Sequence, residues 1–323
     1  MDKNSKIYVA GHVGLVGSAL MRKLKADGYS NIVVRELEEL DLTRQLETEK
    51  FFVKEKPEYV FLAAAKVGGI YANNTYPADF ININLAIQQN VINAAYQNGV
   101  ERLLFLGSSC IYPRNCPQPI KEEYLLTGQL EATNRPYAIA KIAGIEQCWA
   151  FNRQYGTRYL AVMPTNLYGP GDNFDLLHSH VLPALIRKIY EAKVNKSLTV
   201  RVWGTGTPRR EFLYVDEAAE ACVYLMNLSD SKFNHLVEDE FSAPIVNIGY
   251  GSDVTIKELA LMIKDIVGFS GTIEWDATKP DGTPQKLLNV ERLAGLGWKS
   301  KINLRDGIAL AYQAFMEKYV NER

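Results

Sequence analysis

A tyrosine and a lysine lie four residues apart in the middle of the chain, as Tyr137 and Lys141. A proline directly before the tyrosine suits the first turn of a helix, and we predict a helix over 136–154 that places both side chains on one face. A nearby ammonium group lowers the pKa of a phenol, so this tyrosine could transfer a proton. Ser108 follows a predicted strand over 102–107, at the edge of a parallel sheet where ligands bind. Together with a nicotinamide ring, these three groups would transfer hydride between a ketone and an alcohol.

Three glycines with GxxGxxG spacing, Gly11, Gly14 and Gly17, stand between a predicted strand over 6–10 and a predicted helix over 17–27. Such glycines permit a tight turn, close approach to a pyrophosphate and close packing of helix on sheet. The first turn of the helix would then offer amide donors to the phosphates. A purely structural turn would also use glycines, but the position between the first strand and the first helix favours a dinucleotide site.

The residues after the second predicted strand, over 31–35, leave the choice of dinucleotide open. An acidic residue at this point binds the ribose 2′-hydroxyl of NAD, whereas an arginine accommodates the 2′-phosphate of NADP. Here Arg35 and Glu36 occur together. Asp41 and Leu42 could contact the adenine, although Asp41 could equally cap the following helix.

The first 165 residues alternate short β-branched segments with longer helical patterns, which indicates βαβ units. Besides the elements already named, we predict strands over 59–64 and 158–163 and helices over 44–56 and 77–97. The fold class is therefore α/β, with a Rossmann-type doubly wound parallel sheet and a dinucleotide-binding domain over 1–165.

After residue 165 the pattern loosens, with a predicted helix over 181–191 and a strand over 198–203. We expect residues 166–323 to form mainly a smaller, C-terminal substrate-binding lobe. Two segments read as a helix and a buried strand of the first domain, and we expect the chain to return to it near 211–228 and 244–250.

The chain has 323 residues, with 36 Lys and Arg against 37 Asp and Glu. This balance lacks the basic surface that a nucleic acid would require. The most apolar stretch, over 60–70, contains Lys66 and is about half the ~20 residues of a membrane helix. The polar first residues predict no signal peptide, and four cysteines without CxxC spacing predict neither disulfides nor a metal site. We therefore expect a cytoplasmic protein without membrane or nucleic-acid partners.

Beyond these patterns, the chain resembles the extended short-chain dehydrogenase/reductase superfamily and, within it, the GDP-L-fucose synthase family. The resemblance rests on the glycine turn and the Tyr137–Lys141 pair, and on longer runs that are more specific to the family. These runs read AAAKVGGI over 63–70, GSSCIYP over 107–113, PTNLYGP over 164–170 and KPDGTP over 279–284.

The resemblance implies a bifunctional 3,5-epimerase and 4-reductase that acts on GDP-4-keto-6-deoxy-D-mannose. Inversion at C3 and C5 needs two proton carriers besides the tyrosine, and Cys110 and His180 match the family's positions for them. Ser108 and Tyr137 would stabilise the enolate oxygen. The family's cofactor-binding positions include the glycine turn, residues 35–36 and 41–42, Tyr137 and Lys141, together with Leu15, Val16, Ala63, Ala64, Ala65, Lys66, Leu106, Gly107, Pro164, Asn166, Leu167 and His180.

The resemblance also implies a set of substrate contacts and an assembly. The substrate contacts would include Ser108, Ser109, Cys110, Lys188, Trp203, Arg210 and Asp281. Lys188 and Arg210 suit a diphosphate, and Trp203 offers an apolar face. The superfamily suggests a homodimer paired through the helix over 77–97 and the helix that carries Tyr137.

Each of these residues also has a simpler interpretation. Cys110 could be a small buried apolar residue, and His180 could cap the helix after it, with His178 as a second candidate acid. Without the resemblance, Lys188 would be assigned to a solvated helix face, Trp203 to a core and Arg210 to a pair with Glu211. The alternative functions are another nucleotide-sugar epimerase or dehydratase that recycles its cofactor, and a dinucleotide-binding regulator without catalysis.

The resemblance also bears on the choice between NADP(H) and NAD(H). The resemblance implies arginines facing the 2′-phosphate at two positions where this chain has Val13 and Leu37. We favour NADP(H) because a net reduction consumes a reductant. NAD(H) is also possible, and an enzyme that accepts both dinucleotides would fit the mixed signals at these positions.

Overall fold

The computed structural model describes residues 1–176, 179–240, 242–279, 281 and 283–321. Within these residues, six parallel strands form the main sheet in the order β2-β1-β3-β4-β5-β9. The strands are β1 (Ile7–Ala10), β2 (Ile32–Val33), β3 (Tyr59–Leu62), β4 (Arg102–Leu106), β5 (Tyr159–Pro164) and β9 (Ile245–Ile248). Because all strands run in one direction, their carboxyl ends meet along one edge of the sheet.

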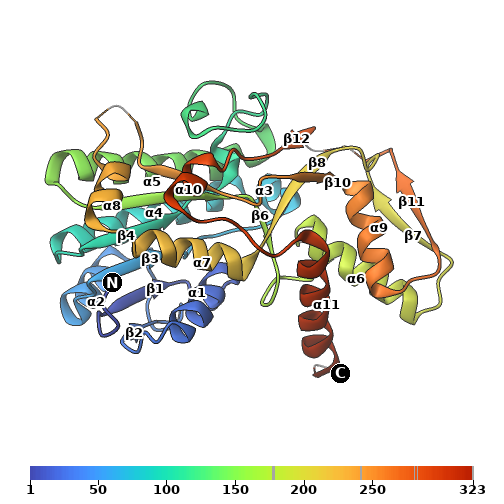
Figure 1. Cartoon of the computed structure of the whole chain (residues 1–323), viewed down its shortest axis with the longest axis horizontal. Coiled ribbons are helices and arrows are strands. Elements are labelled where there is room, and N and C mark those ends of the chain that lie inside the picture. Colours follow the sequence, from blue (N-terminus) through green and yellow to red (C-terminus); the bar gives the residue numbers. More distant parts are fainter. Residues whose placement is uncertain (177–178, 241, 280, 282, 322–323) are drawn as a thin grey trace.

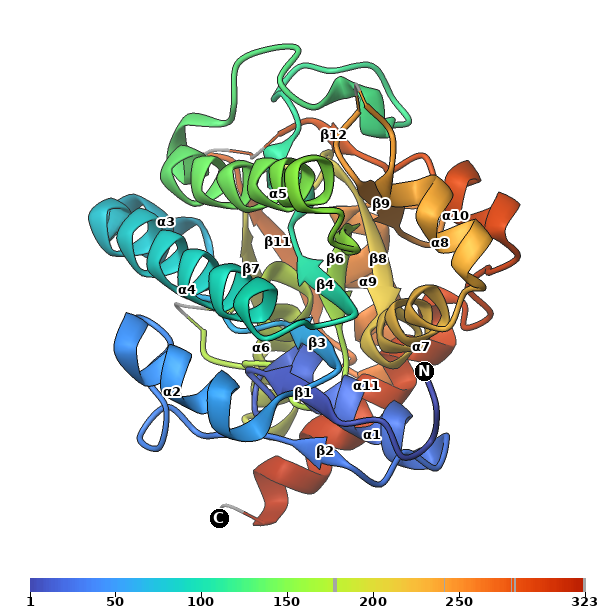
Figure 2. The same ribbon diagram turned by 90° about the vertical axis from the view of Figure 1, so that its left-hand side faces the viewer.

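Helices cover both faces of this sheet (Figure 2). In β1, Ile7 and Val9 point into the core beneath α1 (Leu15–Ala26) and α7 (Val215–Met226), whereas Tyr8 and Ala10 point into the opposite core. The alternation of side chains along a strand produces this division. The second face is covered by α2 (Gln45–Glu55), α4 (Pro77–Gln97) and α5 (Arg135–Tyr155). The predicted α/β, doubly wound parallel sheet is therefore confirmed.

A smaller lobe lies beside the sheet domain, on the right in Figure 1. Its core joins side chains of α6 (Val181–Val194), α9 (Ile256–Val267) and α11 (Leu304–Asn321) with those of β7 (Thr199–Trp203). Strand β11 (Thr272–Asp276) pairs with β7. A small mixed sheet connects the lobes, made of β6 (Asn166–Tyr168), β8 (Arg209–Tyr214), β10 (Asp253–Thr255) and β12 (Gln285–Lys286).

Shorter elements complete the described chain. Helix α3 (Ile70–Thr75) precedes α4, while α8 (Asp230–Val237) and α10 (Glu291–Leu296) pack on the α1–α7 side. The 3-10 helices are η1 (Ser109–Ile111), η2 (Glu122–Tyr124) and η3 (Ala132–Asn134). Among the described helices, none combines the length and apolar character required to cross a bilayer.

Most predicted elements are present with bounds shifted by a few residues, and two segments differ further from the sequence-based expectation. The second strand ends at Val33 and not at residue 35, because its backbone pairing with β1 stops there, and the Arg35 side chain bonds Glu55 of α2. The segment over 211–228 begins as strand β8 and becomes helix α7 only at Val215. Within the main sheet β9 pairs with β5, and α7 packs against α1.

A buried glutamate, Glu211 of β8, ties the lobes together. Its carboxylate accepts backbone N–H bonds from Gly251 at 2.7 Å and from Leu288 at 3.0 Å. The backbone carbonyl oxygen of Glu211 accepts hydrogen bonds from the side chains of Thr165, at 3.2 Å, and Asn166, at 2.8 Å. Both residues lie just beyond β5. The side chain is fully buried, so no water can replace these partners.

Replacing Glu211 with leucine would leave the amides of Gly251 and Leu288 buried without an acceptor, at about 1–3 kcal/mol for each group. We expect the thermal unfolding midpoint, followed by circular dichroism, to fall by about 3–9 °C in a chain of this size. The matched control is Glu274→Leu, on the exposed side of β11. Its midpoint should stay within about 2 °C. Equal midpoints for the two variants would contradict a structural role for Glu211.

Candidate active site

The glycine turn packs tightly between β1, α1 and the loop after β3. Gly11 adopts a φ of +81°, and a Cβ atom there would lie 2.7 Å from backbone atoms of Ala64. A Cβ atom on Gly17 would lie 2.0 Å from the carbonyl oxygen of Gly11. Gly14 caps α1, so Leu15 and Val16 begin the helix with amides directed at the turn. This cradle fits the pyrophosphate of a dinucleotide.

The loops at the carboxyl ends of β3, β4 and β5 lie along the same edge of the sheet. Ala63 donates to the carbonyl of Ala10 at 3.0 Å, and Gly107 donates to Val162 at 2.9 Å. The loop over 63–66 is fixed by Asn84 of α4, whose side chain bonds both the amide and the carbonyl of Lys66 at 3.0 Å. The remaining predicted cofactor positions on this edge are Ala65, Leu106, Pro164, Asn166 and Leu167, which follow or end these strands. Sequence reasoning missed Asn84, because a polar residue in a helix gives no sign of its target.

Ser108, Tyr137 and Lys141 come together beside this edge. The Lys141 ammonium donates to the carbonyl of Leu106 at 2.6 Å and lies 5.8 Å from the centre of the Tyr137 ring. Burial lowers the pKa of Lys141 to about 8. Burial also raises the pKa of Tyr137 well above its usual value, although a hydrogen bond with Ser108 opposes the shift.

The expected lowering of the Tyr137 pKa by Lys141 is therefore not found, because the cost of burying a phenolate is larger. The Lys141 ammonium donates its hydrogen bond to the backbone carbonyl of Leu106 and not to Tyr137. Tyr137 is thus held as a protonated phenol, which suits it to donate a proton.

Cys110 lies in η1, immediately after Ser108. Its backbone amide donates to the Ser108 hydroxyl at 3.3 Å, so one serine contacts both Cys110 and Tyr137. Burial raises the pKa of the Cys110 thiol, while Lys286, Ser108 and Lys141 act in the opposite direction. The neighbouring Ser109 is buried.

His180 occupies the N-cap position of α6, yet its side chain makes no capping hydrogen bond. The alternative in which it merely caps the helix is therefore wrong. His180 keeps contact with solvent, while the protein packed around it partly desolvates the imidazole and so lowers its pKa, with a smaller contribution from Lys286. His178 lies outside the described residues.

Lys286 is a site residue that sequence reasoning missed. It pairs in register with Arg210 across β12 and β8, and it lines a narrow cavity together with Cys110, Glu131 and Asn134. Burial lowers the pKa of Lys286. The only available signal was a lysine directly before Leu287 and Leu288, which does not distinguish a buried cation from a surface one.

The proposed nucleotide-sugar contacts lie on the smaller lobe. Trp203 is 62% exposed, so it is not a core residue, and the Lys188 ammonium lies 5.5 Å from its ring centre. Burial lowers the pKa of Lys188. Arg210 does not pair with Glu211, because successive residues of β8 point to opposite faces.

The Asp281 carboxylate accepts hydrogen bonds from the amide of Thr205, at 3.0 Å, and from the Thr205 hydroxyl, at 2.7 Å. Burial lowers the pKa of Arg210, and the charge of Asp281 opposes this shift to a smaller extent. The structure therefore brings Lys188 to Trp203, and Arg210 to Lys286 and Asp281. Among the described residues no group of three His, Cys, Asp or Glu side chains could hold a metal ion.

The predicted residues for the adenosine part of the cofactor follow β2. Arg35 bonds Glu55 at 2.6 Å, whereas the neighbouring Glu36 is exposed. Asp41 accepts from the amide and hydroxyl of Thr43 at 2.9 and 2.7 Å, and Leu42 is buried. The N-cap of α2 is Arg44, so Asp41 does not cap this helix.

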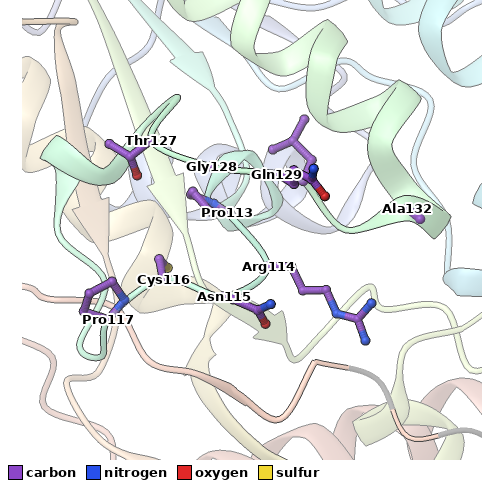
Figure 3. Close-up of a pocket in the computed structure, with 10 residues that line it drawn as sticks. Pro113, Arg114, Asn115, Cys116, Pro117, Thr127, Gly128, Gln129 and Ala132 are labelled. Carbon is purple, nitrogen blue, oxygen red and sulfur yellow. The ribbon is translucent and has the colours of Figure 1, made fainter.

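A second cavity, of about 510 Å³, adjoins the Cys110–Lys286 cavity, and residues that line it are drawn in Figure 3. It is formed by the segment over 113–132, and the two cavities share Pro113 and Arg114. Arg114 is held by Glu131 at 3.1 Å. The larger cavity contains none of the predicted catalytic residues.

The chain is similar to known proteins over most of its length. Residues 7–249 match the NAD dependent epimerase/dehydratase family. The chain is 57% identical to GDP-L-fucose synthase 1 of Arabidopsis thaliana, over 99% of this chain and 96% of that protein. It is 53% identical to GDP-L-fucose synthase of Escherichia coli strain K12, over 97% of each. A GDP-mannoheptose C4 reductase from Campylobacter jejuni, solved with NADP bound, is 42% identical with a TM-score of 0.88, over 98% of this chain and 99% of that one. The chain therefore belongs to the NAD dependent epimerase/dehydratase family and, within it, to the GDP-L-fucose synthases.

Proposed function

We propose that the protein converts GDP-4-keto-6-deoxy-D-mannose to GDP-L-fucose by inverting C3 and C5 and then reducing C4 with a nicotinamide dinucleotide, NADP(H) or NAD(H). The observation that carries this proposal is the position of Ser108, whose hydroxyl contacts both Tyr137 and the backbone of Cys110. One hydroxyl can therefore bind the C4 oxygen between a base for epimerisation and an acid for reduction.

In the epimerase steps, Cys110 as thiolate removes the proton from C3 or C5, and the electron pair moves through the adjacent carbonyl to the C4 oxygen. Ser108 and Tyr137 stabilise the resulting enolate by donating hydrogen bonds. His180 returns a proton to the opposite face of the same carbon, because an imidazolium is an acid that can release its proton to a carbanion. Lys286, beside Cys110, favours the thiolate over the thiol.

In the reductive step, a dinucleotide bound at the glycine turn would supply hydride to C4. Tyr137 donates its proton to the C4 oxygen as the carbonyl becomes an alcohol. The high pKa of Tyr137 keeps this proton in place until negative charge develops on the substrate oxygen. Lys141 then stabilises the phenolate that remains, because its ammonium lies over the same ring.

The lobe over 166–323 would bind the GDP portion, with residues 1–165 and the returning α7 and β9 holding the dinucleotide. Arg210 and Lys188 suit the diphosphate, since both are cations whose burial favours binding an anion. Trp203 offers an exposed aromatic face, and Asp281 orients Thr205 and Arg210. We expect the protein to act in the cytoplasm.

A second copy of the chain would pack on the outer faces of α4 and α5. These helices lie side by side (Figure 2), and Ile139 of α5 is 42% exposed. Tyr96 and Tyr155 stack with ring centres 4.3 Å apart and both remain exposed. These apolar groups support the homodimer suggested by the superfamily.

The proposal is tested by incubating the protein with GDP-4-keto-6-deoxy-D-mannose in deuterated water, with NADPH and NADH in parallel. We expect dinucleotide oxidation at 340 nm and, by NMR, deuterium at C3 and C5 of a fucose product. Deuterium uptake without dinucleotide oxidation would instead indicate an epimerase that recycles its cofactor. Dinucleotide binding with no reaction would redirect the search to other nucleotide sugars.

Replacing Cys110 with serine should abolish deuterium exchange at C3 and C5, because an alcohol is a far weaker acid than a thiol and is not ionised near neutral pH. Dinucleotide affinity should remain unchanged. The matched control is Cys116→Ser, a half-buried thiol in the neighbouring cavity, which should exchange at the wild-type rate. Wild-type exchange in the Cys110 variant would show that another group is the base.

Replacing Lys286 with methionine removes a cation that lowers the pKa of Cys110, so the thiolate should form only at higher pH. We expect the pH profile of deuterium exchange to move upward by about half a unit or more, and Lys286→Arg to restore it. Alkylation of Cys110 by iodoacetamide, measured in a Cys116→Ser background, should shift in parallel. Lys299→Met, at an exposed loop position after α10, serves as the charge control. An unchanged profile for Lys286→Met would contradict the assigned role.

A further inference from the structure

The edge of the dinucleotide site beside β2 has an unusual charge pattern. Arg35, the cation expected to receive a 2′-phosphate, is occupied elsewhere. Its guanidinium bonds Glu55 at 2.6 Å and the carbonyl of Val34 at 2.7 Å, and it lies 5.5 Å from the ring centre of Phe51. These contacts draw the side chain toward α2 and neutralise its charge.

The other cations of the strand-end loops are also paired. Lys66 bonds Asp79 at 3.0 Å, and Arg44 lies 3.6 Å from Asp41. Within the part of the chain that the structure describes, the loops after β1, β2 and β3 therefore present no lysine or arginine without an acidic partner.

Apolar and acidic side chains occupy the exposed positions instead. Strands β1 and β2 pair in parallel, from Ile7 opposite Ile32 onward, so the loops that follow them emerge at the same edge. Val13 in the glycine turn and Leu37 after β2 are each 69% exposed. Glu36 is exposed between Arg35 and Leu37, and its carboxylate has no cation within the described residues that pairs with it.

We propose that this edge selects the ribose 2′-hydroxyl, so that the protein binds NADH more tightly than NADPH, with Glu36 as the specificity-determining residue. A carboxylate after the second strand accepts a hydrogen bond from a 2′-hydroxyl. The same carboxylate repels a 2′-phosphate, and no free cation compensates. This inference rests on the dinucleotide site of the proposed function and revises the preference for NADP(H) suggested by the overall reaction.

The test measures dissociation constants for NADH and NADPH without sugar, from nicotinamide fluorescence. We expect NADH to bind about five- to tenfold more tightly at low ionic strength. Salt screens the repulsion between Glu36 and a 2′-phosphate, so the ratio of the two constants should approach one as the salt concentration rises. A site that held the 2′-phosphate by cations would lose NADPH affinity with salt.

Two variants locate the effect. Glu36→Gln should tighten NADPH binding several-fold and change NADH binding by less, whereas Glu38→Gln, an exposed neighbour, should change neither. Tighter wild-type binding of NADPH than of NADH would overturn the inference while leaving the proposed reaction intact. An unchanged NADPH constant in Glu36→Gln would overturn the role of Glu36. Binding of neither dinucleotide would overturn both the inference and the proposed dinucleotide site.

Discussion

The buried carboxylate of Glu211 sets the relation between the two halves of the substrate site. A carboxylate sealed from water must find donors within the protein, and it finds them in the amides of Gly251 and Leu288. These bonds fix the direction of β8 and bring the chain at Leu288 against it. Because side chains alternate along a strand, an inward Glu211 requires Arg210 to point the other way, in register with Lys286. The cations of the cleft are thus placed by a residue that takes no part in the chemistry.

Burial favours the neutral form of every titratable group in the site, so it raises the pKa of acids and lowers the pKa of bases. It raises the pKa of Tyr137 and Cys110 and lowers that of Lys141 and His180. A buried group can accept a proton only if nearby groups stabilise its charged form. For the Cys110 thiolate, Lys286 and Ser108 provide this stabilisation. The Tyr137 phenolate is stabilised by Ser108 alone among the causes that act on its pKa, so Tyr137 keeps its proton and acts as a donor. The different roles of two similar acids therefore follow from their neighbours.

The sheet could be predicted because its signals are local: β-branched segments, glycine spacing and helix-favouring stretches such as 77–97, which matches α4 at both ends. The Ser108, Tyr137 and Lys141 cluster followed from one spacing and the rule that strand ends face the ligand. Lys286 and Asn84 could not be found this way, since their importance depends on partners about 18 to 176 residues away in the chain, as with Lys66 for Asn84 and Cys110 for Lys286. The start of β8 was missed for the same reason, because Glu211 in isolation resembles a surface helix residue. The direction of the Tyr137 shift required knowing how deeply the ring is enclosed.

The glycine turn and the residues beside it differ sharply in their tolerance of change. Gly11 and Gly17 cannot accept even one additional carbon, whereas Val13, Glu36 and Leu37 project into solvent and support no packing. Evolution can therefore alter the adenosine end of the site without disturbing the phosphate grip or the fold. A lineage could move this reaction between the catabolic and the biosynthetic reductant pools through a few surface substitutions, while the catalytic groups stay as they are.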